Sequence, residues 1–222
     1  MVEDRETTMY NALEKARKDP DSMKARVLTA ARKLFGEYGY HGTTTRMIAK
    51  EVGIDISTLY YHWGEKKDLF ESVVVDVIDD YRGMIQELEG KAKGKPLYER
   101  YEVAIDHICD FLMSHPEVPN LMLFQMFSKT KQEFEHDIRS PVTLNEVAFA
   151  MGFPMEDRDS SIKIKAGILA VWFSIFSFIA GEKHIRPIFD MGHDPYADLV
   201  KDTMKRILIP TFGRKSKEPR QG

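Results

Sequence analysis

Residues 43–69 decide the fold and read Thr43-Thr44-Thr45-Arg46-Met47-Ile48-Ala49-Lys50-Glu51-Val52-Gly53-Ile54-Asp55-Ile56-Ser57-Thr58-Leu59-Tyr60-Tyr61-His62-Trp63-Gly64-Glu65-Lys66-Lys67-Asp68-Leu69. Apolar residues mark one face of a short first helix, and Gly53 has the backbone freedom that a tight turn needs. Asp55 is a good N-cap for a second short helix that starts at Ile56. Two short helices joined by a turn of a few residues form a helix-turn-helix.

The second of these helices has the composition of a DNA recognition helix. In a helix-turn-helix its N-terminal residues lie against base edges in the major groove. Leu59 and Trp63 are four residues apart, so they share an inward face that can pack against the small Ala49. The alternative is a surface helical hairpin that ends in aromatic residues. The candidates for base or phosphate contact are the remaining polar, flat or N-terminal side chains: Ile56, Ser57, Thr58, Tyr60, Tyr61 and His62.

The run from Val27 to Leu69 resembles the N-terminal domain of the TetR family of bacterial transcriptional regulators. The chain departs from the family pattern at Trp63 for Phe, Ser57 for Gly, Asp55 for Ser, and Glu65 for a capping Ser or Asn. The resemblance covers about the first third of the chain. The matching positions, in order and without gaps, are Ala30-Ala31, Leu34-Phe35, Gly39, Thr43-Thr44, Ile48-Ala49, Gly53, Thr58-Leu59-Tyr60, Lys66 and Leu69.

Two further features of this stretch favour contact with DNA phosphates. A hydroxyl at a helix N-terminus, such as that of Thr43 or Thr44, lies beside free backbone N–H groups and can help to bind a phosphate; it can equally be a plain N-cap. Lys66 is a phosphate contact by the family resemblance, and otherwise a solvated surface charge. Residues 22–69 carry eight basic and five acidic side chains, although the formal net charge of the whole chain is −3. The basic excess is therefore local to this module.

The remaining pattern predicts an all-α protein with four parts. Residues 1–21 form an N-terminal arm, which we expect to be frayed or loosely docked. Residues 22–68 form a three-helix DNA-binding domain whose first helix runs from Ser22 to Tyr38 and stops at Gly39. Residues 69–212 form a larger helical domain for effector binding and dimerisation, and residues 213–222 form a disordered tail.

Two helices in the second half predict a dimer interface. Residues 162–181 are apolar all round, so in a soluble protein such a helix must be covered by its own core and by another subunit. A membrane span is the alternative for this run. Residues 195–208 form a last amphipathic helix, and two such helices from each of two chains make a four-helix interface. The family resemblance implies the same homodimer.

By the resemblance, a small molecule binds among the C-terminal helices. The abundance of Met and Phe favours an apolar or aromatic effector, although Met also fills irregular cores. We expect fewer than half of the candidate residues to contact a ligand. The candidates are Tyr101, Ile105, His107, Ile108, Phe111, Met122, Gln125, Met126, Phe149, Trp172 and Phe176.

No enzyme signature is present in the sequence. It lacks a Gly-x-Ser-x-Gly elbow, a His-Glu-x-x-His pair and a dinucleotide-binding fingerprint, and no two histidines have helical ligand spacing. We therefore predict no catalytic residues, no metal site and no cofactor. The single Cys109 fits a reducing cytosol, and residues 1–5 lack the apolar core of a signal peptide, so we expect a cytoplasmic protein.

The sequence is best interpreted as a ligand-responsive transcriptional regulator, and we expect a repressor. It would bind a near-palindromic double-stranded operator as a homodimer and be released by a small apolar or aromatic effector. The alternative is a helical nucleic-acid-binding or scaffold dimer with no small-molecule effector.

Overall fold

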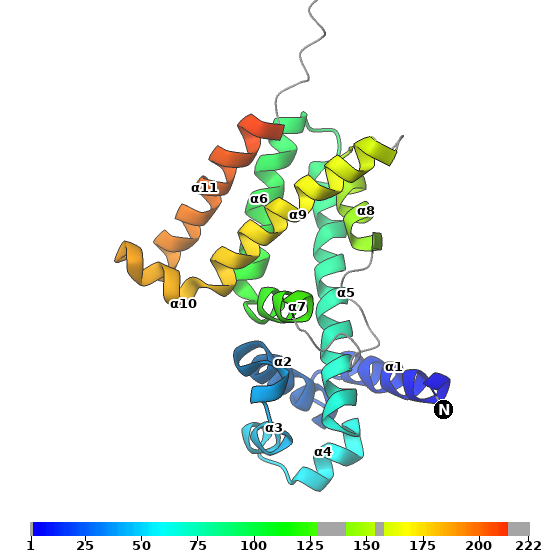
Figure 1. Ribbon diagram of the computed structural model, residues 1–222. Coiled ribbons are helices and arrows are strands. Elements are labelled where there is room, and N and C mark those ends of the chain that lie inside the picture. The colour runs from blue at the N-terminus through cyan, green and yellow to red at the C-terminus, as the bar shows by residue number, and fades with distance from the viewer. Residues whose placement is uncertain (1, 128–140, 154–157, 213–222) are drawn as a thin grey trace, which may run out of the picture. The chain divides into compact units, whose positions relative to one another are not determined.

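The computed structural model describes residues 2–127, 141–153 and 158–212. The predicted disordered tail, 213–222, lies outside this part. Within the described residues all regular structure is helical, as the sequence predicts (Figure 1). The elements are α1 (Val2–Lys18), α2 (Met23–Gly42), α3 (Thr45–Val52), α4 (Ile56–Trp63), α5 (Lys66–Ala92), α6 (Leu97–Ser114), α7 (Glu117–Phe127), α8 (Pro141–Ala150), α9 (Arg158–Ala180), α10 (Glu182–Ile185), the 3₁₀ helix η1 (Arg186–Phe189) and α11 (His193–Phe212).

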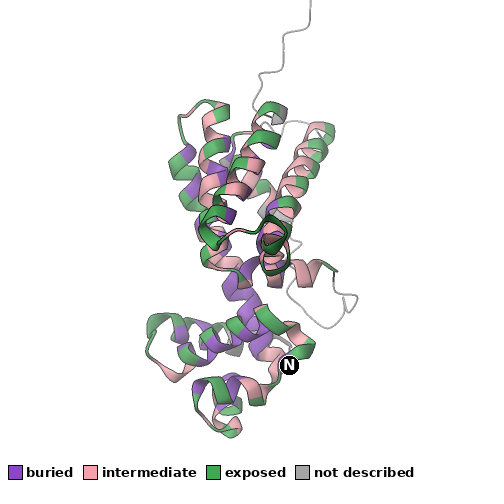
Figure 2. Ribbon diagram, turned by 90° about the vertical axis from the view of Figure 1, so that its left-hand side faces the viewer, coloured by how far each residue is buried: buried purple, intermediate pink, exposed green. Residues whose placement is uncertain are grey.

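The chain folds as two compact units that divide the long helix α5 between them. The first unit comprises residues 1–80 and 120–138, and the second comprises residues 81–119 and 139–222. The sequence places this division after residue 68, near the start of α5 at Lys66. The structure instead keeps the first half of α5 with the helix-turn-helix, because residues 69–77 are buried there on every side (Figure 2).

The N-terminal segment corrects the expectation of a frayed arm. Residues 2–18 form the helix α1, and its Leu13 and Ala16 are buried. These two residues are three apart and so occupy one face of the helix, which packs against α2 and α4. The first unit is therefore larger than a three-helix domain.

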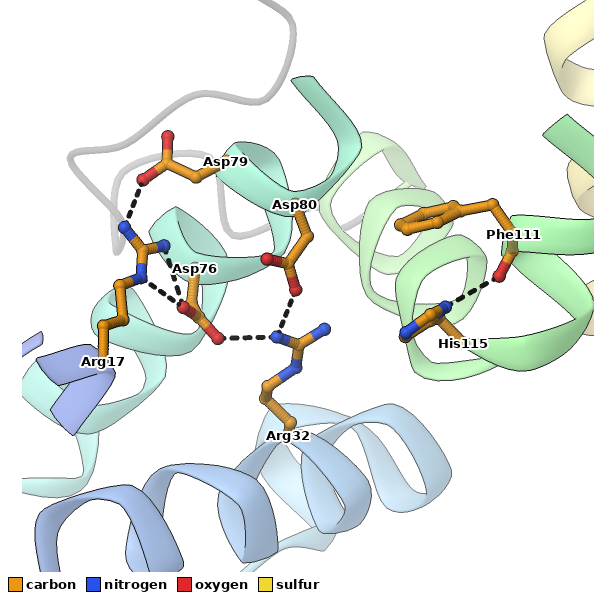
Figure 3. A network of polar contacts seen from close by, with 7 residues as sticks. All are labelled: Arg17, Arg32, Asp76, Asp79, Asp80, Phe111 and His115. Atoms are coloured by element: carbon orange, nitrogen blue, oxygen red, sulfur yellow. Dashed lines mark hydrogen bonds and ion pairs between the residues drawn. The ribbon is translucent and has the colours of Figure 1, made fainter. Parts of the chain in front are cut away.

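An ion-pair network ties α1 and α2 to α5 (Figure 3). The Asp76 carboxylate lies 2.8 Å from an Arg17 nitrogen and 2.6 Å from Arg32 Nη1. Arg17 also pairs with Asp79 at 3.0 Å, and Arg32 with Asp80 at 2.5 Å. The side chain of Asp76 is 7% exposed, so this carboxylate is almost fully withdrawn from water and depends on the two guanidinium groups.

The helix α2 ends in the way its sequence indicates, with one extra turn. Ser22 is the N-cap, and its hydroxyl accepts a hydrogen bond from the Ala25 N–H at 3.2 Å. Gly39 has a φ of 69°, which interrupts the helix where the sequence places its end, and a short turn continues to Gly42. Beneath this turn, Phe35 packs edge-on against Phe70 of α5 with 5.0 Å between ring centroids.

The second unit is a helical bundle in which α6, α8 and α11 pack against α9. Two ion pairs join α11 to α6: Lys201 with Asp110, and Lys205 with Asp106 at 2.6 Å. The Tyr196 hydroxyl donates to the Phe178 carbonyl oxygen at 2.8 Å and so ties α11 to α9. These contacts fix the framework that surrounds the apolar helix α9.

One side of α9 is left uncovered within the single chain. Among the described residues, α9 is the one helix long and apolar enough, by length and composition, to cross a membrane. Only 17% of its most apolar stretch is buried. Its inner residues Ile175, Phe176 and Ile179 are buried, whereas small residues at Ala166 and Ala170 are exposed.

Candidate functional site

The two neighbouring threonines at the start of α3 have different roles. Thr44 is exposed and is the N-cap, because its hydroxyl accepts a hydrogen bond from the Met47 N–H at 3.1 Å. Thr43 is fully buried, and its hydroxyl lies 2.9 Å from the carbonyl oxygens of both Leu34 and Gly39. The assignment of Thr43 to DNA contact is therefore wrong: its hydroxyl is used to close the end of α2, out of reach of a phosphate.

The turn between α3 and α4 has the geometry that its glycine indicates. Gly53 is left-handed, with φ 76° and ψ 40°. The Ile54 N–H donates to the Ala49 carbonyl oxygen at 3.0 Å, and the Gly53 N–H donates to the carbonyl oxygens of Lys50 at 3.2 Å and Ala49 at 2.9 Å. This is the Schellman pattern, which an L side chain at the left-handed position would strain. Asp55 is the N-cap residue of α4, as predicted from the sequence, although its side chain makes no capping hydrogen bond.

The C-terminal end of α4 is fastened to α2. Lys24 Nζ donates to the His62 carbonyl oxygen at 2.5 Å, and Trp63 Nε1 donates to the Lys24 carbonyl oxygen at 3.2 Å. Burial lowers the pKa of the His62 imidazole, and the nearby Lys24 charge lowers it further. His62 is therefore neutral at physiological pH. Because its carbonyl group is already bonded, only its ring is left to meet a partner.

The outer face of α4 presents polar and aromatic side chains to solvent. Leu59 and Trp63 are buried, as their spacing predicts, and they orient the rest of the helix. Tyr61 is 85% exposed and Tyr60 is 47% exposed. Ser57 is also exposed. Ile56, Thr58 and His62 are half-buried. Two neighbouring aromatic rings are therefore exposed on a short helix whose other face is anchored. Such a patch is a candidate interaction surface.

Lys66 begins α5 at the edge of this face. Its ammonium lies 4.2 Å from the centroid of the Tyr40 ring, and burial lowers its pKa. The Glu65 N–H donates to the Asp68 carboxylate at 2.8 Å, which is one half of a capping box. Asp68 thus supplies the cap that the Glu65 departure removes, and α5 starts at the residue that the sequence indicates. Sequence reasoning missed Tyr40, since no periodicity connects it with Lys66.

The second unit contains an apolar cavity of about 300 Å³. Four of its lining side chains carry a polar atom: Tyr81, Tyr101, Lys163 and Trp172. The apolar lining comes from α5 with Leu88, from α6 with Ala104, Ile105 and Ile108, from α8 and its C-terminal flank with Val147, Met151 and Phe153, from α9 with Ile164, Gly167, Ile168, Val171 and Ile175, and from α11 with Leu208.

The structure brings only some of the predicted effector residues to this cavity. Tyr101, Ile105, Ile108 and Trp172 line it. Met122, Gln125 and Met126 belong to the first unit, whereas the cavity lies within the second. Sequence reasoning missed most of the α9 lining, although its spacing of three and four residues was a usable signal.

The other four predicted effector residues have neighbours or settings of their own. His107 lies 3.0 Å from Lys91 Nζ and 3.5 Å from a Glu87 oxygen. The Phe111 ring stacks on His115 with 4.6 Å between centroids (Figure 3). Phe149 is 73% exposed, and Phe176 is buried against Trp172. None of the four is among the lining residues.

The described part of the chain holds no group of three or more histidine, cysteine, aspartate or glutamate side chains that could bind a metal ion. Cys109 is buried, and burial raises its thiol pKa to about 12, so it is not a thiolate at neutral pH.

Comparison with known proteins agrees with the helix-turn-helix geometry. Residues 27–73 match the family described as bacterial regulatory proteins of the tetR family. An HTH-type transcriptional regulator of Staphylococcus aureus strain USA300 is 26% identical over 171 residues, which cover 76% of this chain and 88% of that protein. Another, from strain MRSA252, is 31% identical over 99 residues, 45% of this chain and 52% of the relative, so the match spans about half of that relative.

A solved structure shares the arrangement of helices over nearly the whole chain. The transcriptional regulator FadR from Bacillus subtilis in complex with stearoyl-CoA superposes with a TM-score of 0.53 at 18% identity, covering 86% of this chain and 98% of that chain. At this identity the similarity establishes the fold alone. The matched family consists of transcriptional regulators and not of enzymes. Residues 27–73 place the DNA-binding domain of this chain in the TetR family of bacterial transcriptional regulators.

Proposed function

We propose that this regulator is a repressor that binds a near-palindromic operator as a homodimer and leaves it when an apolar effector enters the second unit. The observation that carries the proposal is the α4 face, on which Tyr60 and Tyr61 remain in water while Leu59 and Trp63 are buried beneath them. A recognition helix needs such an outward face, held by an inward anchor.

The exposed groups divide between two kinds of DNA contact. Ser57, Thr58 and Tyr61 lie on the N-terminal and outer part of α4 and are assigned to base edges, with Ile56 and His62 flanking them. Thr44 and Lys66 each begin a helix, where backbone N–H groups and the positive end of the helix dipole favour a phosphate. Tyr60 is assigned to a phosphate as well. A protein that binds DNA in this way acts in the bacterial cytoplasm.

The partner that covers α9 is a second copy of the chain. The uncovered face carries Ala166, Ala170, Ser174 and Ser177 at helical spacing, flanked by Ile162 at 55% exposure. Small side chains allow two helices to approach closely, and an isologous two-fold contact would bury the same face on both subunits. The helix α11, which packs against α9, completes a four-helix interface.

An effector in the cavity can influence the DNA contacts through α5. This single helix begins at Lys66, and its second half supplies Tyr81 and Leu88 to the cavity lining. A ligand shifts the operator-bound population only to the extent that it prefers the other conformation. The stearoyl-CoA held by FadR, a molecule with a long apolar chain, is in keeping with an apolar effector here.

Selection from random duplex DNA tests the proposal. The full-length protein is incubated with the pool at two salt concentrations, and the bound DNA is sequenced. We expect an inverted repeat whose half-site centres are one helical turn, about 34–36 Å, or a multiple of it apart. Recovery of no motif by a folded protein would contradict sequence-specific binding and leave a helical dimer without an operator.

Sedimentation velocity tests the interface. Ala170→Arg places a charge on the uncovered face of α9 and should yield monomers that lose most of their affinity for the inverted repeat. Glu102→Arg puts the same side chain on an exposed position of α6 and serves as the control. If Ala170→Arg sediments as the wild-type protein does, α9 is not the interface.

A further inference from the structure

The cavity in the second unit runs along α9 and has one exposed end and one buried end. One face of α9 lines it from Lys163 to Ile175, every third or fourth residue, over about 18 Å of helix. Lys163 at one end is exposed, and Ile175 at the other end is 1% exposed. The cavity therefore has a wet rim at Lys163 and a closed end near Ile175 and the adjacent Trp172.

An unpaired donor lies toward the closed end. The indole Nε1 of Trp172 is buried and has no hydrogen-bond partner among the described residues. Leaving a buried N–H unpaired costs free energy, so such a group in a native structure calls for an explanation. Trp172 lines the cavity, and an acceptor on a bound ligand would satisfy it.

The Tyr81 hydroxyl is a second polar group beside this indole. The two rings lie 6.0 Å apart, and both residues line the cavity. Burial raises the pKa of Tyr81, and a weaker interaction with Trp172 opposes the rise. That contact falls short of hydrogen-bond geometry, since the indole nitrogen stays unpaired. Tyr81 is therefore a protonated phenol that can donate to the same acceptor as Trp172.

The rim offers a positively charged group, whereas the closed end offers neutral donors. Lys163 carries the one formal charge among the lining residues. It lies nine residues before Trp172 on the same helix, so their Cα atoms are about 13 Å apart. Between the two, the lining side chains of α9 are Ile164, Ile168 and Val171.

We infer that the ligand is an elongated aliphatic carboxylate with a second, neutral oxygen acceptor at its far end. Its carboxylate pairs with Lys163 at the rim, its methylene chain lies along α9, and a carbonyl oxygen accepts from Trp172 Nε1 and the Tyr81 hydroxyl. This inference rests on the proposed effector site and deepens it by naming the ligand class, an oxo-carboxylic acid.

Isothermal titration calorimetry with three matched twelve-carbon compounds tests this inference. Dodecanoic acid has only the head group, dodecan-2-one has only the distal acceptor, and 11-oxododecanoic acid has both. The full-length wild-type protein should bind 11-oxododecanoic acid about tenfold more tightly than dodecanoic acid, since one hydrogen bond to a buried donor contributes on this scale.

Variants assign each end of the ligand. Trp172→Phe keeps an aromatic side chain but removes the indole donor, so within this variant the affinity for the oxo acid should fall to that for dodecanoic acid. Tyr81→Phe should reduce the same preference and replaces Trp172→Phe if that variant does not fold. Lys163→Met should weaken both acids but not dodecan-2-one, whereas Lys165→Met, two residues away and outside the lining, should match the wild type.

The possible failures are distinguishable. Equal affinity of the two acids for the wild type, or an oxo preference that survives in both Trp172→Phe and Tyr81→Phe, overturns the assigned ligand class while the effector site stands. Binding of none of the three compounds to a protein that still binds its operator overturns the aliphatic effector itself, and this inference with it.

Discussion

The two units of the chain treat apolar surface in opposite ways. In the first, a continuous stretch of α5, residues 69–77, is buried on every side, and the charges beside it are paired. In the second, apolar side chains line an open cavity, and α9 leaves one side uncovered. A unit that presents fixed side chains to DNA gains from a closed core. A unit that, as proposed, admits a ligand and a second subunit cannot be closed within one chain.

The same substitution in both units tests this contrast with the largest expected effect. Ala31 is fully buried in α2, so Ala31→Phe has no space for the ring and should lower the free energy of unfolding by about 3 kcal/mol. Ala104 is buried too but lines the cavity, so Ala104→Phe should cost less than about 1 kcal/mol and block the effector. Urea unfolding followed by circular dichroism measures both, and equal losses would contradict the contrast.

The next prediction concerns the ion pairs that close the first unit. Asp76→Ala leaves Arg32, whose side chain is 15% exposed, with Asp80 as its remaining partner in the network. Because a buried charge that loses a partner is costly, the free energy of unfolding should fall by about 2–3 kcal/mol.

Asp79→Ala is the matched control. Its carboxylate is 38% exposed and pairs with Arg17, so the loss should be below about 1 kcal/mol. The two unfolding midpoints are compared in urea. If Asp76→Ala is as mild as its control, the network does not hold α1 and α2 to α5.

The sequence predicts the first unit well because local rules place its parts. Gly53 needs its left-handed conformation, and Leu59 and Trp63 point inward by spacing alone. The cavity follows a different logic. Tyr101 and Phe111 lie on the same helix and are equally aromatic, but only Tyr101 lines the cavity. Which of them does so depends on which helices pack alongside, and that information is not local to either residue.

The same limit explains the errors in the first unit. The burial of Thr43 depends on the carbonyl oxygen of Leu34, nine residues earlier, and the docking of α1 depends on Asp76, far along the chain. Neither contact has a signature in the surrounding sequence. Local pattern identifies which residues can be caps or charges, and the tertiary partner decides what they do.

Thr43 and Thr44 turn this point into a test with an intermediate effect. Thr43→Val keeps the shape but removes the buried hydroxyl, so stability should fall by about 1–2 kcal/mol with operator affinity unchanged in the folded protein. Thr44→Ala removes the N-cap, costs about 1 kcal/mol, and should also weaken operator binding. Unfolding and fluorescence anisotropy are measured for both, and a loss of affinity in folded Thr43→Val would restore it as a DNA contact.

The smallest effect on stability is expected at Lys66, where the effect on DNA binding is distinctive. Lys66→Gln removes one charge beside the Tyr40 ring, a contribution of about 0.5–1 kcal/mol to stability. Since a phosphate contact releases a counterion irrespective of sequence, the variant should weaken operator and random DNA equally and reduce the slope of log affinity against log salt by about 1. An unaltered slope in Lys66→Gln would make Lys66 a structural partner of Tyr40 and would move the phosphate contact at the start of α5 to another group.

Tyr61→Ala is the counterpart of Lys66→Gln. Because Tyr61 is assigned to base edges, its loss should weaken operator binding by about 1–3 kcal/mol, relax specificity and leave the slope of log affinity against log salt unchanged.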